Sequence, residues 1–391
     1  MTDTIVLTLK QGMFTILEPD RFSPSARGLL NASYQLGGRA NMSCYQNPTP
    51  RELGSGIYKP RLTLTGRINK EHNFEITLRT ELSLPKLLLG NNFDELTDSD
   101  FGAVIQKLQA VLKEMGVYVF EKNLINAPVS AIHYPKNIPL TDGSTPYMYL
   151  KEIQKANINQ RLDFNQTDFR NEGHSLKFRA NSFEIAFYDK VKDLEKAKIS
   201  EKRAIEKDNY IQINLFDDIQ QYRKQKPFEI LRMEVRLNQR QKIRQVLQKI
   251  GLQVEPTFQN LFKKEIAQKV LLYHLDQIEN TYPKLLYFKP KSAKYFVAQF
   301  VIDNPEAKIK DPFTTLGFHT ALDELGTREI RELLKKYPKW AWYRCYDEIN
   351  SFNYPKTALP IFEPIRNSID EFKPLKLLDF QGRMLNNDKY N

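Results

Sequence analysis

The sequence predicts an α+β protein with an antiparallel sheet core of two related halves, followed by a mostly helical C-terminal region. Residues 183–190 and 231–238 alternate apolar and polar side chains with period two, as strands do. The order strand, helix, strand recurs in the two parts of the chain before residue 250. Beyond residue 257, apolar residues recur at helical spacing. We therefore expect three domains: 1–145, 146–250 and 251–391.

Within the first predicted domain, we expect strands where alternation is clear and a helix where apolar residues recur every three or four positions. The expected strands are 4–9, the pair 61–68 and 73–84, and 129–134, which Pro135 would end. Residues 20–56 are rich in Gly, Ser, Asn and Pro and are predicted to be loop. The segment 84–92 is predicted to close the strand pair with a helix breaker and turn residues. Residues 98–115 form the clearest amphipathic helix, with N-cap candidates at 97–99 and a C-cap candidate at Gly116.

The second predicted domain begins after a connection at 135–147. We expect a helix at 149–162, a hairpin of 174–179 and 182–188, a charged helix at 193–208, helix at 209–222, a strand at 231–237 and a basic helix at 239–250. In the third domain, the expected helices are 258–280, a helix-turn-helix-like pair around Gly326 within 311–337, and 339–350. Residues 295–302 fit helix and strand equally. The tail after Pro355 is predicted to be extended.

Composition and charge narrow the class of protein. The chain has 391 residues, of which 41% are hydrophobic and 27% charged, as in globular proteins. No stretch approaches the roughly 18 apolar residues that span a bilayer, and the N-terminus lacks the apolar core of a signal peptide. Cys44 and Cys345 fit no zinc spacing and indicate a reducing setting. We expect a protein of the bacterial cytoplasm with no membrane partner.

The chain is strongly basic. Its net charge is +11 and its pI is about 9.3. Such an excess favours an anionic partner, with nucleic acid first and an anionic membrane surface second. DNA is therefore the predicted partner.

The predicted strand 231–237 carries a row of charged residues. If Leu231, Met233, Val235 and Leu237 face a core, then Arg232, Glu234 and Arg236 line the other face of the same strand. A carboxylate between two guanidiniums forms a structural ion-pair ladder in many proteins. The same row also suits a metal ligand set among phosphate-binding groups. The sequence leaves both interpretations open.

Four stretches, in order, resemble the gene II/X replication initiators of filamentous phages and, more loosely, rolling-circle plasmid initiators. They are 82–92, 129–134, the strand 183–190 that ends in Tyr-Asp-Lys, and the Arg-x-Glu-x-Arg strand at 231–238. The resemblance covers about residues 80–250. It implies the fold of the HUH-type nickases. It also implies an origin-specific enzyme that nicks one DNA strand, in which a tyrosine stays linked to the 5′ phosphate and frees a 3′ hydroxyl.

The resemblance also implies a divalent cation, Mg²⁺ or Mn²⁺, which would neutralise the phosphodiester. Glu234 matches the glutamate of the family's last strand, and we expect it to be a metal ligand. His133 stands where the family usually has aspartate, and Asp189 belongs to the Tyr-Asp-Lys element; both are further candidate ligands. Without the family in view, His133 is more often a structural histidine and Tyr188 a packing residue.

Tyrosine has a pKa near 10, so the nucleophile needs activation. The family's nucleophile lies between the two strands, where this chain has Tyr210 and Tyr222; Tyr210 is the first choice and Tyr222 the second. Lys190 would contact the scissile phosphate or lower the pKa of the tyrosine. The residues expected to contact DNA are Arg232, Arg236, Lys177 and Arg179.

A second function class fits the same features. A non-catalytic initiator that binds and melts its origin would also need a basic α+β body with terminal helices. Histidine in place of aspartate at position 133 favours this class mildly. In either class, a host helicase is a possible further partner, with residues 258–391 as its docking region.

Overall fold

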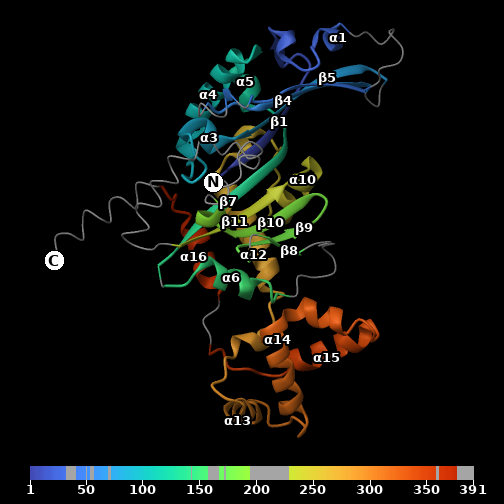
Figure 1. Cartoon of the computed structure of the whole chain (residues 1–391), viewed down its shortest axis with the longest axis vertical. Coiled ribbons are helices and arrows are strands. Elements are labelled where there is room, and N and C mark those ends of the chain that lie inside the picture. The colour runs from blue at the N-terminus through green and yellow to red at the C-terminus, as the bar shows by residue number, and fades with distance from the viewer. Residues whose placement is uncertain are drawn as a thin grey trace, which may run out of the picture.

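A computed structural model describes residues 1–31, 41–49, 51–52, 57–68, 72–141, 143–156, 167–170, 173–193, 229–357 and 361–376. Its centre is one antiparallel sheet, to which these ranges contribute nine strands in the order β3-β4-β5-β1-β7-β11-β10-β9-β8 (Figure 1). A mostly helical region follows the last strand. The predicted α+β class, with an antiparallel sheet and a helical C-terminal region, is confirmed.

The alternating stretches of the sequence form the sheet. The strands are β1 (Thr4–Lys10), β3 (Asn41–Gln46), β4 (Arg61–Ile68), β5 (Phe74–Ser83), β7 (Val129–Leu140), β8 (Thr167–Arg170), β9 (Ser175–Arg179), β10 (Phe183–Asp189) and β11 (Glu229–Leu237). The predicted strands and the hairpin of β9 and β10 are confirmed. β7 and β11 pair along most of their length, so the sheet runs without a break from the first predicted domain into the second.

β7 is longer than predicted. It continues through Pro135 and Pro139, and residues 135–140 are strand rather than connection. β1 pairs with β7 only as far as Ile132, whereas β11 pairs with β7 up to Leu140. Beyond Ile132, β7 therefore has a partner strand on one side in the described residues. Proline lacks an N–H and is tolerated where a strand has such an open edge.

The region 20–56, predicted to be loop, contains an edge strand. β3 pairs with β4, and Cys44 is fully buried opposite Leu64. Three short elements precede β3 in the sequence: β2 (Phe14–Ile16), η1 (Pro19–Arg21) and α1 (Arg27–Leu30). β2 forms a small separate sheet with β6 (Val117–Val119). The many Gly, Ser and Asn residues of this region disfavour a strand locally, so β3 was not predicted. Its pairing with β4 outweighs that local preference.

The helices of the first part pack on one another and contact β5 and β6. They are α3 (Leu84–Leu89), η3 (Asp98–Asp100), α4 (Phe101–Glu114) and α5 (Glu121–Ile125). The segment 84–92 was predicted to contain a helix breaker and turn residues, but its first six residues form α3. Pro85 lies in the first turn of this helix, where the missing N–H of proline breaks no hydrogen bond within the helix. Gly90, with a φ of 72°, ends it in the left-handed conformation. The predicted helix at 98–115 is confirmed, with a capping box between Thr97 and Asp100.

Two helices of the second part frame the later strands. α6 (Pro146–Ile153) contacts β10 and β11, and α10 (Arg240–Lys249) contacts β7 and β11. α10 agrees with the prediction. α6 begins three residues before the predicted helix 149–162 and ends at Ile153, well before the predicted end, and residues 157–162 lie outside the described residues. The helices predicted for 193–208 and 209–222 also lie outside the described residues, apart from residue 193.

The C-terminal region adds further helices. They are α11 (Phe258–Leu261), α12 (Lys264–Glu279), η5 (Lys284–Tyr287), α13 (Ala293–Asp303), α14 (Asp311–Leu333), α15 (Lys339–Ser351) and α16 (Phe362–Glu371). α12 packs on β7 and β11 and α16 packs on α12 and β7, so the apolar face of the sheet is covered. The segment 295–302 is helix. The tail was predicted to be extended, but α16 buries Phe362, Ile365 and Ile369 there.

α14 bends where the sequence predicted a break between helices. Gly326 has φ 74° and ψ 167°, which separates the helix into two segments. Thr327 Oγ1 donates to Lys155 O (3.2 Å), and Lys155 Nζ donates to Asp323 Oδ1 (2.8 Å). These contacts tie α14 to the end of α6, while α13–α15 project from the body (Figure 1). Among the helices described, none is long and apolar enough to cross a bilayer.

Candidate functional site

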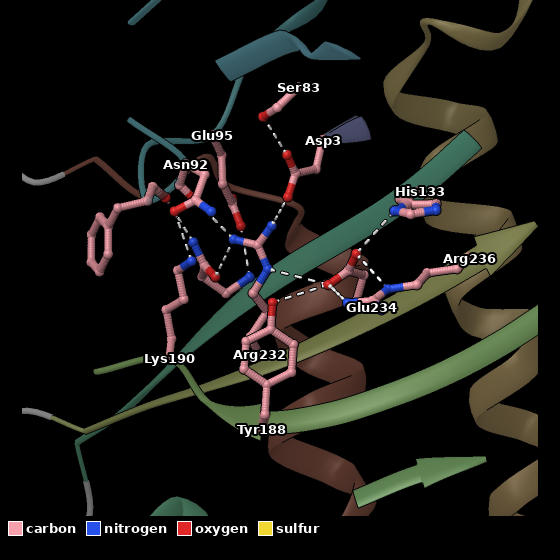
Figure 2. A network of polar contacts seen from close by, with 12 residues as sticks. Asp3, Ser83, Asn92, Glu95, His133, Tyr188, Lys190, Arg232, Glu234 and Arg236 are labelled. Atoms are coloured by element: carbon pink, nitrogen blue, oxygen red, sulfur yellow. Dashed lines mark hydrogen bonds and ion pairs between the residues drawn. The ribbon is translucent and has the colours of Figure 1, made fainter. Parts of the chain in front are cut away.

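The charged row of β11 lies on the sheet face opposite the apolar core, as predicted. Strand register places Arg236 opposite His133 of β7 and Glu184 of β10. Arg232 stands opposite Tyr188 in the same way. Side chains at paired positions share one face of an antiparallel sheet, so alternation gathers these residues together. Figure 2 shows His133, Tyr188 and Arg232 joined to Glu234 and Arg236 in one connected network.

This face borders a cavity of about 300 Å³. Its walls come from the start of β1, the end of β5, α3, and the strands β7, β10 and β11. Both signs of charge line it. The acids are Asp3, Glu81, Asp193 and Glu234, the cations are Arg61, Lys86 and Arg236, and His133 and Tyr188 lie among them. Segments far apart in the sequence thus meet at one polar cavity.

Glu234 is the centre of the network and is only 3% exposed. Arg236 donates from Nε to Glu234 Oε1 (2.9 Å) and from Nη2 to Oε2 (3.1 Å). His133 Nδ1 lies 3.4 Å from Oε1, and the Tyr188 hydroxyl donates to Oε2 (3.0 Å). Burial alone would raise the pKa of Glu234, but Arg236, His133 and Arg232 outweigh it and hold that pKa well below its ordinary value. Glu234 is therefore a fixed, ionised carboxylate.

Arg232 is buried beneath this carboxylate. Its Nη2 donates to Asp3 Oδ2 (2.6 Å), and its Nη1 donates to Asn92 O (2.9 Å) and to Asn137 Oδ1 (3.3 Å). Its Nε lies 4.0 Å from Glu234 Oε2, too far for a hydrogen bond. With 2% exposure and partners within the protein, Arg232 does not present its guanidinium to a DNA backbone, contrary to the prediction.

The other predicted DNA contacts surround a second buried acid, Glu184. Arg236 Nη1 donates to its Oε1 (2.8 Å), and Arg179 Nε donates to its Oε2 (2.5 Å). Lys177 Nζ lies 3.6 Å from Oε1. The side chains of these three cations keep 18% to 35% of their surface exposed. They remain at the rim of the face, but each already has a carboxylate partner.

Tyr188 belongs to the site, although strand tyrosines are commonly packing residues. Its hydroxyl meets Glu234, and its ring lines the cavity. Burial and the nearby Glu234 raise the pKa of Tyr188 well above its ordinary value, against the opposing effect of Arg232. The phenol is therefore neutral and acts as a hydrogen-bond donor.

Lys190 is fully buried next to this group. Its Nζ donates to Asn92 Oδ1 (2.9 Å), and Figure 2 shows it beside Arg232. Burial, together with Arg232, lowers the pKa of Lys190 to about 7. A lysine of this kind changes its charge near neutral pH. In this arrangement it supports Asn92 and does not reach the cavity surface, contrary to the predicted phosphate contact.

Asp189 does not join Glu234, contrary to the prediction that both are ligands of one metal. It pairs with Leu231 and so points to the opposite face of the sheet. Its Oδ1 accepts from the backbone N of Lys192 (2.9 Å), and His174 Nδ1 lies 3.8 Å from Oδ2. Asp189 therefore caps the turn that follows β10.

The predicted nucleophiles, Tyr210 and Tyr222, lie outside the described residues. The segment that contains them connects the helical turn after β10 to β11. Both ends of this connection are described: Asp193 lines the cavity, and β11 carries Glu234.

The donor set offers limited support for a divalent cation. In the described part of the chain, no group of three or more His, Cys, Asp or Glu side chains is arranged to hold a metal ion. His133 and Glu234 supply one nitrogen and one carboxylate, which suits Mn²⁺ in donor type. Arg236 already occupies both carboxylate oxygens, so the charge balance of the pair does not fit a cation unless Arg236 moves.

Sequence reasoning missed several members of the network. Asp3, Asn92 and Glu184 come from separate elements, and single polar residues in strand starts and loops carry no recognisable spacing. Glu184 had a usable signal: it alternates in phase with Tyr188 on β10 and faces the row of β11.

Comparison with known proteins finds no match to this chain. No protein-family model, no curated protein and no solved structure matches it.

Proposed function

We propose that the protein is a replication initiator that nicks one strand of an origin through a tyrosine, with Glu234 and His133 at the reaction centre. The supporting observation is that an ionised carboxylate, an imidazole and a phenol meet at one cavity wall, with distances of 3.4 Å and 3.0 Å from Glu234. Paired groups of this kind at a polar cavity are typical of reaction centres.

In this proposal, the protein groups have separate roles. The nucleophile is Tyr210 or Tyr222, whose oxygen would bond to phosphorus as the 3′ oxygen leaves and takes up a proton. Arg236, whose side chain is 26% exposed, pairs with the carboxylate of Glu234 and suits a phosphate contact. If Arg236 leaves the carboxylate for the phosphate, Glu234 and His133 would be able to hold a divalent cation, Mg²⁺ or Mn²⁺, which would neutralise the phosphodiester.

A non-catalytic initiator is the second candidate, and one observation favours it. Glu234 accepts two hydrogen bonds from Arg236 and one from Tyr188, as the centre of a structural ladder would. A closed ladder needs no metal and performs no chemistry. Such a protein would bind and melt its origin and recruit other replication proteins, a host helicase among them.

A nicking assay separates the two candidates. The protein is incubated with supercoiled plasmids carrying segments of its own genetic element, in the presence of Mg²⁺ or Mn²⁺. The nickase predicts nicked circles and a covalent protein–DNA adduct that withstands detergent. Glu234→Gln should lower nicking by at least about 100-fold, as expected for loss of a group at the reaction centre.

Matched substitutions control for folding. Tyr210→Phe should abolish the adduct, whereas Tyr295→Phe on α13 should leave it intact. Glu255→Gln, which removes an exposed acid near Arg244, should also retain activity. Wild-type protein that binds DNA and never nicks it with either metal would favour the non-catalytic candidate. Normal nicking by Tyr210→Phe would transfer the role to Tyr222.

A further inference from the structure

A second cavity lies in the helical C-terminal region, apart from the sheet. It measures about 350 Å³ and is formed by the second segment of α14, the turn after it and the start of α15. Figure 1 shows these two helices below the sheet. Four cations line it: Arg328, Arg331, Lys335 and Lys339. Among the described residues of its lining, Glu332 is the only acid. We call this cavity the α14–α15 cleft.

The cations are gathered there by helical spacing. Arg328 and Arg331 are three residues apart on α14, which places them on one side of the helix, and Lys335 follows in the turn after it. Lys335 Nζ meets Glu332 Oε1 at 2.8 Å, so the single acid is already engaged by one cation. Burial lowers the pKa of Arg328, and the neighbouring Arg331 lowers it further. The cleft therefore retains an excess of positive charge that an anion would offset.

Aromatic side chains share the cleft with these cations. Tyr337 and Tyr343 line it. Tyr337 is 53% exposed, and Tyr343 is half-buried. Exposed rings beside cations form the surface that unpaired nucleobases and their phosphates require.

The buried wall of the cleft also contains a hydrogen-bond donor that lacks an acceptor. Trp342 is only 8% exposed, and its indole Nε1 has no hydrogen-bond partner in the part of the chain that the structure describes. Buried indole N–H groups usually have a partner. An oxygen acceptor entering the cleft would supply one.

We propose that the α14–α15 cleft binds single-stranded nucleic acid, with its cations on the phosphates and its exposed aromatic rings on the bases. A duplex stacks its bases on one another, so ring faces would find no target there. An anionic membrane surface suits a helix with a broad apolar face, whereas this site is a hollow lined by cations. The proposal does not depend on nicking or on Glu234.

The test measures binding of a fluorescein-labelled 20-nucleotide single strand of mixed sequence to the full chain, by anisotropy at several salt concentrations. Lys335→Ala with Lys339→Ala should weaken binding about ten-fold. The same double variant should lower the slope of log affinity against log salt by about 1.4, because each phosphate contact on a single strand contributes about 0.7. Tyr337→Ala should weaken binding about five-fold and leave the salt slope unchanged.

A charge-matched control is available around the start of α13. Lys291→Ala with Lys294→Ala removes two exposed lysines from the same region, outside the cleft, and should leave affinity and slope unchanged. Circular dichroism shows whether each variant is folded. The proposal is overturned if the cleft variants and the control bind equally. Binding to a duplex and to phosphatidylserine vesicles is measured in parallel. The proposal is also overturned if the cleft variants lose binding only to the vesicles, or if Tyr337→Ala weakens duplex binding and single-strand binding equally.

Discussion

Replacing Lys190 by methionine should change how stability depends on pH. In the folded protein, burial beside Arg232 lowers the pKa of Lys190 from 10.5 to about 7. At about 1.4 kcal/mol per unit, the protonated form destabilises the fold by at most about 5 kcal/mol relative to a solvated lysine. Methionine has nearly the same length and carries no charge, so the substitution removes this penalty. It also removes the hydrogen bond to Asn92, which costs about 1 kcal/mol at every pH.

The sign follows from proton linkage. Between pH 7 and pH 10.5 the unfolded chain holds a proton on Lys190 that the folded protein releases, so this group makes the free energy of unfolding rise with pH. The rise amounts to about 2 kcal/mol between pH 7 and pH 9. The free energy of unfolding of the wild type should therefore gain about 2 kcal/mol on that of Lys190→Met over this interval. All other titrating groups are common to both proteins and cancel in the difference.

Urea denaturation at pH 7, 8 and 9 measures this difference. Lys294→Met, at an exposed site on α13, is the matched control, and its difference from wild type should not change with pH. If the Lys190→Met difference is also constant across the three pH values, then the buried lysine does not titrate in this interval. The account of the network around Arg232 and Asn92 would then be wrong.

Three further substitutions test particular contacts by urea denaturation. Glu95→Gln leaves the ammonium of Lys136, at 2.6 Å, without its buried carboxylate and should destabilise by about 3 kcal/mol, whereas an effect below 1 kcal/mol would contradict the ion pair. Gly326→Ala places a Cβ 3.3 Å from the Cα of Lys155 at a φ of 74°, and should cost about 2 kcal/mol; no loss would show that the helix break tolerates side chains. Tyr188→Phe removes the hydrogen bond to Glu234 and should cost about 1 kcal/mol.

Strands were predictable from sequence wherever one face is apolar and the other polar. β4 is half-buried, as its period-two alternation indicates. β10 and β11 alternate in the same way, although the polar side chains of both strands are largely buried as well. β7 shows the limit of such reasoning. Pro135 is a reliable signal against a central strand, but the partner on one side of β7 ends before that residue. The sequence of β7 contains no information on where β1 stops.

The helix α16 was not predicted, for a related reason. Three prolines after Pro355 indicated an extended tail, yet residues 362–371 form an amphipathic helix whose apolar side packs on α12. The stabilising contact comes from an element nearly a hundred residues earlier. Arg366 Nη2 reinforces it by donating to Glu279 Oε2 (2.6 Å). Short helices depend on tertiary packing more than on their own propensity.

For the site, the sequence predicted the charged row of β11 and proposed His133 and Glu234 as candidate metal ligands. Their separation of 3.4 Å follows from register, which the sequence did not reveal. The predicted use of Asp189 was wrong in a way that alternation could have corrected. Asp189 and Glu184 lie an odd number of residues apart on one strand, so only one of them can share the face of Glu234.

The positive charge of the chain is not concentrated at the sheet site. There Arg232 meets Asp3, Arg236 meets Glu234 and Glu184, and Arg179 meets Glu184, so each of these buried or half-buried cations is matched by an acid. Matched charges fix side chains in place but attract a distant polyanion weakly, because the fields of paired charges cancel beyond a few ångströms. In the proposals above, a phosphate backbone would be drawn by a surface where cations outnumber acids, as they do four to one in the described lining of the α14–α15 cleft. This separation lets the sheet face keep a rigid carboxylate while another surface supplies affinity, and it explains why substituting the cleft should change the salt dependence of binding while substituting Glu234 should not.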